Sequence, residues 1–167
     1  MNTIILIFAT MFLFHNIQAQ ENDKFDLYDL AFLVGKWEAI ANDSSFISVL
    51  EYKFSPEGRL LFASNHLYGK EGKNLGVYEG AYLLDDQQII YFLSGPKGET
   101  HEGTATIVND TLVHLASVNP GRYVKTYRSE MVFKDGRLYY YANYTKEKEY
   151  PSNVEYNNPL IYVRQTD

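Results

Sequence analysis

The chain lacks cysteine entirely and contains one tryptophan among 167 residues. Without cysteine it forms no disulfide, offers no thiol nucleophile and has no attachment point for a lipoprotein-type anchor. It also lacks a basic block, because 21 Asp and Glu outnumber 15 Lys and Arg, for a formal net charge of −6. An acidic chain of this kind is not expected to bind nucleic acid or anionic membrane surfaces.

Short motifs for nucleophilic catalysis and phosphate binding are also missing. No serine lies in a Gly-X-Ser-X-Gly pattern, and none is placed so as to suggest an adjacent base. The stretch GPKG at 95–98 lacks the strand–loop–helix context of a phosphate-binding loop. These absences argue against a nucleophilic hydrolase and against nucleotide binding, and we predict no cofactor.

The longest apolar run is N-terminal, in MNTIILIFATMFLFHNIQAQ. Residues 4–14 are apolar except for Thr10, and this run is shorter than the about 20 apolar residues that a membrane span needs. Ala19 supplies a small residue where a signal peptidase cuts. We therefore predict a signal peptide at 1–19, a secreted or periplasmic protein without membrane insertion after processing, and one domain over 20–167. The absence of cysteine favours bacterial export.

Turn signals such as SPEG, VNDT and KDGR recur between segments rich in Val, Ile, Tyr, Phe and Thr. About ten strands are predicted, near residues 36–42, 46–54, 59–68, 74–84, 88–94, 100–108, 111–118, 122–134, 137–145 and 160–164. A short N-terminal helix is predicted with Asp23 as its cap and Gly35 as its stop, and with a buried face formed by Leu27, Leu30, Ala31 and Val34. The fold class is therefore all-β, an antiparallel up-and-down β-barrel of about 8–10 strands.

At FLVGKWEA, a short helical pattern leads into Gly-X-Trp on the first strand, at Gly35 and Trp37. This arrangement resembles the lipocalin (calycin) group, and most closely its small bacterial secreted domains that begin Phe-Leu-Val/Ile-Gly-X-Trp. The resemblance implies that Trp37 seals one end of a barrel and that a basic side chain from a late strand covers it. Arg164 is the candidate for that cation–π contact. The resemblance concerns the fold and not the function.

Tight turns fix strand register, and register decides which side chains share a face. With Asp135-Gly136 as a two-residue loop, the predicted cross-strand pairs are Arg128–Asn143, Glu130–Tyr141 and Val132–Tyr139. With Asn109-Asp110 as the loop of the preceding hairpin, they are His114–Ala105 and Ala116–Gly103. A three-residue loop at 119–121 is predicted to join the two hairpins, which places His114 opposite Thr126.

One continuous face results, which combines small residues with a few polar groups, as ligand cavities do. Its members are His101, Gly103, Ala105, His114, Ala116, Arg128, Glu130, Tyr139, Tyr141 and Asn143. We predict that this face is interior. The alternative is a solvated charged face with surface tyrosines, because Val113, Leu115 and Met131 occupy the opposite side.

No metal site is predicted on this face. His114 pairs with Ala105, four residues from His101, and at about 3.3 Å per residue the two imidazoles lie roughly 13 Å apart. Two ligands of one zinc ion must each lie about 2 Å from it.

The leading functional prediction is the binding of a small, partly polar or anionic molecule inside the barrel. Arg128 would hold an anion, with Glu130, Tyr139, Asn143 and His101 as further ligand-binding residues. The alternative is a carbohydrate-active lyase, dehydratase or isomerase acting on an acidic sugar or oligosaccharide, with Tyr141 and His114 as acid and base. A third possibility is an interaction protein with exposed tyrosines, in which Arg128 and Glu130 form a structural pair.

Overall fold

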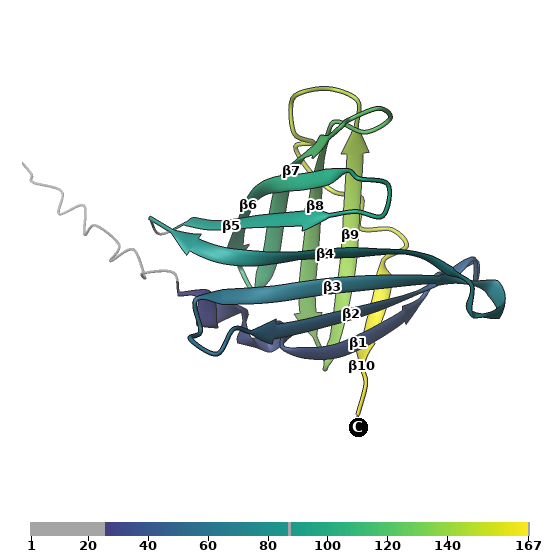
Figure 1. Ribbon diagram of the computed structural model, residues 1–167, viewed down its shortest axis with the longest axis horizontal. Coiled ribbons are helices and arrows are strands. Elements are labelled where there is room, and N and C mark those ends of the chain that lie inside the picture. Colours follow the sequence, from purple (N-terminus) through teal and green to yellow (C-terminus); the bar gives the residue numbers. More distant parts are fainter. Residues whose placement is uncertain (1–25, 87, 167) are drawn as a thin grey trace, which may run out of the picture.

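The computed structural model describes residues 26–86 and 88–166, in which ten strands form a closed antiparallel barrel (Figure 1). In chain order they are β1 (Gly35–Ile40), β2 (Phe46–Phe54), β3 (Leu60–Gly69), β4 (Asn74–Asp85), β5 (Gln88–Ser94), β6 (Thr100–Val108), β7 (Thr111–Asn119), β8 (Thr126–Lys134), β9 (Arg137–Thr145) and β10 (Leu160–Arg164). Each strand pairs with the next in the chain, and β10 returns to pair with β1. The predicted up-and-down barrel is confirmed.

The two tight hairpins have the registers that their turns predict. Asp135 and Gly136 both have positive φ, 52° and 73°, as do Asn109 and Asp110, at 49° and 60°. Two consecutive central residues with positive φ form a type I′ turn, whose twist matches that of the two strands it joins. The pairs predicted across both turns, such as Glu130–Tyr141 and His114–Ala105, are all present and so confirmed.

The connection between β7 and β8 differs from the prediction. Instead of a three-residue loop at 119–121, residues 120–125 link the two strands, and the Val118 N–H donates to the Lys125 carbonyl at 2.8 Å. His114 therefore lies opposite Ser129 rather than Thr126. That shift is an odd number of residues, so it turns every side chain of β8 and β9 to the face opposite the predicted one.

A 3₁₀ helix, η1 (Leu27–Leu33), stands where a short helix was predicted, and a second short one, η2 (Lys70–Gly72), follows β3. Three residues complete one 3₁₀ turn, so the buried face of η1 is Leu27, Leu30 and Leu33. The predicted inclusion of Ala31 is wrong, because that residue is exposed. Asp26 caps the helix through a capping box with Asp29. The predicted cap, Asp23, and the predicted signal peptide at 1–19 lie outside the described residues.

Trp37 closes the end of the barrel beside η1. Its side chain is fully buried, and its indole N–H donates to the Leu33 carbonyl at 2.7 Å. The Arg164 guanidinium carbon lies 4.4 Å from the centre of the Trp37 ring, and its Nη2 donates to the Phe32 carbonyl at 2.9 Å. The expected cover of Trp37 by Arg164 is therefore confirmed. Gly35 has φ of +122°, a conformation that only glycine adopts without strain.

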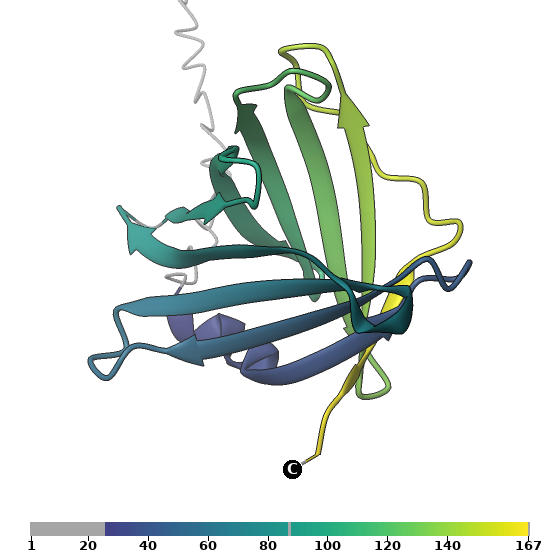
Figure 2. The ribbon, with the colours of Figure 1, turned by 45° about the vertical axis from the view of Figure 1, so that its right-hand side comes forward.

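The barrel has a seam beside β9. β10 pairs with 137–140 of β9 and with Trp37 and Glu38 of β1, which leaves the remainder of β9 without a strand on that side. Residues 146–159, here called the C-terminal strap, run down the outside of this part of β9 (Figure 2). The side chains of Asn42 and Asn158 join the β1–β2 hairpin to the strap through a hydrogen bond of 2.6 Å. Among the described residues, no helix is long and apolar enough to cross a bilayer.

Candidate functional site

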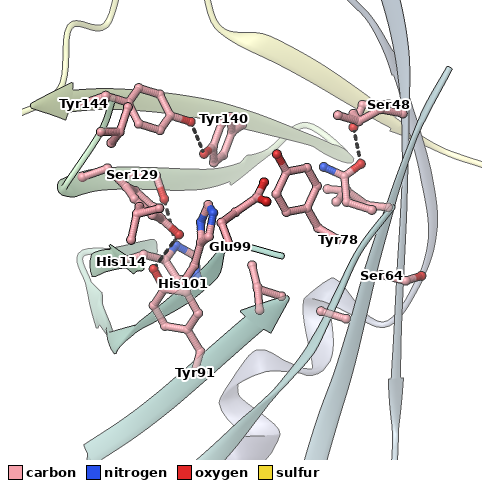
Figure 3. A pocket seen from close by; sticks show the side chains of 18 of the residues that line it. Ser48, Ser64, Tyr78, Tyr91, Glu99, His101, His114, Ser129, Tyr140 and Tyr144 are labelled. Atoms are coloured by element: carbon pink, nitrogen blue, oxygen red, sulfur yellow. Dashed lines mark hydrogen bonds between the residues drawn. The ribbon is translucent and has the colours of Figure 1, made fainter. Parts of the chain in front are cut away.

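A cavity of about 740 Å³ occupies the inside of the barrel (Figure 3). This volume falls within the roughly 300–1,000 Å³ of small-molecule pockets. Tyrosine dominates its lining, with Tyr52, Tyr78, Tyr82, Tyr91, Tyr123, Tyr127, Tyr140, Tyr144 and Tyr162. A structural core would ordinarily place aliphatic side chains at such positions, so a wall of phenol rings surrounding empty volume marks this cavity as the candidate site.

Of the predicted site residues, His101 and His114 line the cavity. The other five were placed on the wrong side of the barrel wall, because of the odd shift after β7. These five, which lie on the outer face, are Arg128, Glu130, Tyr139, Tyr141 and Asn143. Their alternating neighbours face inward instead, and the sequence reading missed them as lining residues: Tyr127, Ser129, Met131, Tyr140 and Tyr144.

His114 is the centre of a buried hydrogen-bonded cluster. Its Nε2 lies 3.0 Å from the Tyr82 hydroxyl, and its Nδ1 lies 3.2 Å from the Ser129 hydroxyl. Burial lowers the pKa of His114 to about 4, so the ring is neutral near pH 7. A neutral imidazole carries one donor and one acceptor nitrogen, so one of the two hydroxyls donates and the other accepts.

Two pairs of tyrosine hydroxyls lie further along the same wall. Tyr91 donates to Tyr127 at 2.8 Å, and the hydroxyls of Tyr140 and Tyr144 are 3.4 Å apart. Burial raises the pKa of Tyr91, Tyr127 and Tyr140, so these phenols stay protonated at neutral pH. They present polar groups to the cavity without charge.

A fourth cluster joins β2, β3 and β10. The Ser48 hydroxyl donates to the Asn65 side-chain oxygen at 2.7 Å and lies 2.7 Å from the Tyr162 hydroxyl. Because the single Ser48 hydrogen is directed to Asn65, Tyr162 donates to Ser48. Among the described residues, every buried side-chain nitrogen or oxygen has a hydrogen-bond partner.

The mouth of the cavity carries its charged groups. Lys97 and Glu99 lie in the loop between β5 and β6, and Arg122 lies in the loop between β7 and β8. The Tyr78 hydroxyl points toward the Glu99 carboxylate (Figure 3). Burial and this carboxylate together raise the pKa of Tyr78 to about 12. Burial lowers the pKa of His101, an effect that Glu99 opposes. Charge is thus confined to the rim.

On the outer face, Glu130 binds the strap to the barrel. Glu130 is 3% exposed, and its carboxylate accepts from Arg128 Nε at 2.8 Å and Nη2 at 2.7 Å. The other carboxylate oxygen accepts from the Tyr156 hydroxyl of the strap, whose ring centre lies 5.0 Å from that of Tyr141. Arg128 and Glu130 therefore form a structural pair here. The barrel wall separates the predicted catalytic partners Tyr141 and His114, and the predicted acid–base constellation is not assembled.

A second hollow, of about 480 Å³, lies at the seam between β9, the β1–β2 hairpin and the strap. Four of its lining residues also line the main cavity: Phe46, Tyr140, Tyr144 and Leu160. These four side chains therefore lie between the main cavity and the second hollow. Among the described residues, no group of three or more His, Asp or Glu side chains has a geometry that would hold a metal ion.

Comparison with known proteins leaves the chain without an assigned family. No protein-family model matches it. No curated protein matches it. Among solved structures, it is similar to a de novo designed fluorescence-activating β-barrel, at 12% sequence identity and a TM-score of 0.42, over 60% of this chain and 92% of that chain. Nothing about function follows from so distant a similarity. The class of the protein is defined by its own geometry, a closed antiparallel β-barrel around a tyrosine-lined cavity.

Proposed function

We propose that this protein is a secreted, lipocalin-like barrel that binds a small, partly polar molecule inside its cavity. The observation that carries the proposal is the cavity itself, about 740 Å³ in volume and lined by apolar side chains and nine tyrosines. Mostly apolar concave walls with a few placed polar groups are typical of small-molecule sites. Arg128 lies outside the cavity, so it does not hold an anion there.

Two further observations support the finer parts of the proposal. A short helix, Gly35, the buried Trp37 and the covering Arg164 occur together at one end of the barrel, as the lipocalin resemblance implies. The apolar run at 4–14, with Ala19 after it, supports export of the chain and removal of 1–19.

Cavity filling provides the test. Ala63 lines the cavity, so Ala63→Trp places an indole in the volume that a ligand would occupy. Ala81, on the neighbouring strand, pairs with the outward-facing Phe62, and Ala81→Trp is the matched control. Leu67→Trp, at a half-buried lining position, serves if Ala63→Trp fails to fold.

Native mass spectrometry would follow the purified protein mixed with naphthalene derivatives, steroids, fatty acids and acidic oligosaccharides. We expect an adduct of unchanged ligand mass on the wild type and on Ala81→Trp, and its loss on the cavity-filled variant. Absence of any adduct on the wild type would refute the proposal. An oligosaccharide that loses the mass of water would establish the enzymatic alternative instead.

A further inference from the structure

We infer that the cavity takes an uncharged ring compound that carries hydrogen-bond acceptor oxygens, such as carbonyl or ether groups. This inference rests on the proposed binding function and specifies its ligand. Three independent features of the lining lead to it: where charge is located, how many hydrogen-bond donors the walls hold, and how the aromatic rings are arranged.

The charge distribution excludes an ionic group from the interior. Of the residues that line the cavity, the charged ones are Lys97, Glu99 and Arg122, all in loops at the mouth. Deeper in, apolar side chains line the cavity together with polar groups that carry no charge: phenols, hydroxyls, an amide and the neutral His114 ring. A charged ligand group placed there would lose its water without gaining a counter-ion, which is strongly unfavourable.

The tyrosine pairs hold more donors than they use. Two hydroxyls that bond to each other bring two hydrogens, and one of these lies between the oxygens, whichever group donates. The Tyr91–Tyr127 pair and the Tyr140–Tyr144 pair each therefore retain one O–H hydrogen.

The same count holds for the other two clusters. Between them, Tyr82, Ser129 and the neutral His114 hold three hydrogens for two contacts. Asn65 accepts from Ser48 through its oxygen, so neither of its N–H hydrogens takes part in that contact. Each of the four clusters thus holds at least one donor beyond those used in its own contacts of 3.4 Å or less. A ligand that displaces water from these donors must replace the lost hydrogen bonds with its own acceptors.

The rings of the wall favour a flat ligand. Tyr82 and Tyr91 stack with ring centres 5.5 Å apart, and His114 meets Tyr91 edge-on at 4.9 Å. Nearer the mouth, His101 meets both Tyr78 and Tyr127 edge-on, at 5.6 and 5.5 Å. A flat aromatic ligand would add further offset or edge-to-face contacts to these protein rings, because such contacts are favourable at the ring separations observed here.

Three naphthalene probes separate these requirements. The first is the neutral ketone 6-propionyl-2-(dimethylamino)naphthalene, and the second is 2-(dimethylamino)naphthalene, which lacks the carbonyl. The third is 6-(dimethylamino)-2-naphthoic acid, whose carboxylate is charged at neutral pH. Fluorescence titration gives Kd for each. We expect the ketone to bind most tightly, with Kd about threefold to tenfold lower than for the probe without the carbonyl, since one net hydrogen bond is at stake. The carboxylate should bind more weakly than the ketone by about tenfold or more, because its charge would be buried without a counter-ion.

Paired substitutions locate the donors. Tyr91→Phe/Tyr127→Phe removes both hydroxyls of a pair and leaves neither partner unsatisfied, so the barrel should stay folded. It should weaken ketone binding about threefold to tenfold without changing Kd for the probe that lacks the carbonyl. Tyr140→Phe/Tyr144→Phe is the second variant of this type. Tyr68→Phe is the control, because Tyr68 stacks on His66 and does not line the cavity.

The outcomes distinguish this inference from the proposed function. If the carboxylate binds as tightly as the ketone, or if neither paired variant affects the ketone selectively, the ligand class is wrong while cavity binding stands. If none of the three probes binds the wild type, the proposed function fails and the inference fails with it.

Discussion

Protonation of His114 should destabilise the barrel on mild acidification. His114 is 4% exposed, and this burial disfavours the charged imidazolium in the folded state. The pKa of His114 is about 4 in the folded state, against about 6.5 in an unfolded chain. The unfolded state therefore binds a proton first as pH falls, and the stabilisation from neutral His114, fully present above pH 6.5, is lost progressively below it. Between pH 8 and pH 5 the loss is about 2 kcal/mol of unfolding free energy.

Urea denaturation at a series of pH values, compared between wild type and His114→Gln, would measure this effect. The two proteins share every other titratable group, so the contributions of those groups cancel in the difference. We expect the wild type to lose about 2 kcal/mol more than the variant over this range. Equal losses in the two proteins would refute the reasoning. If His114→Gln does not fold, an NMR titration of the wild-type ring gives its pKa directly, and a value near 6.5 would refute it equally.

Three further changes test other parts of the structure. Glu130→Ala should lower the unfolding free energy by about 2–3 kcal/mol, because it leaves Arg128 unpaired and frees the strap. Tyr156→Phe should lower it by less than about 1 kcal/mol but speed proteolysis of the strap. Equal effects of the two substitutions would contradict the role of Glu130 as the residue that joins Arg128 and the strap. Gly35→Ala should cost about 1–3 kcal/mol in urea denaturation, because of its positive φ, and an unchanged midpoint would argue against that conformation. Protein recovered from an exporting bacterial host should lack 1–19 by intact mass, and retention of these residues would rule out the predicted cleavage.

Local sequence was sufficient for much of the fold. Two adjacent residues with positive φ at Asp135-Gly136 and at Asn109-Asp110 set the register of each hairpin by themselves, so the pairs across them could be predicted. Helical propensity at η1 was also readable. The helix type was not: the leucines at 27, 30 and 33 repeat every three residues, which is the period of the 3₁₀ helix observed, whereas an α-helix was assumed.

The candidate site depended on the connection at 120–125. Nothing local fixes the length of that loop, and a strand exchanges its two faces with every odd shift in register. His101 and His114 were placed correctly, since both precede the loop, whereas all predicted site residues after it were placed on the wrong face. One signal was available: YRSEM at 127–131 alternates Tyr, Ser and Met with Arg and Glu, and the uncharged set is the one that can be buried without a partner.

The sequence by itself therefore determined the strands, the tight turns and an all-β barrel, because alternation and turn chemistry act over a few residues. The connection at 120–125 set the register of β8 and β9 and so decided which of their tyrosines face the cavity. It also placed Arg128 and Glu130 under the strap, through contacts between segments that are distant in the chain. Such contacts depend on the summed register of all ten strands, which no single local pattern specifies.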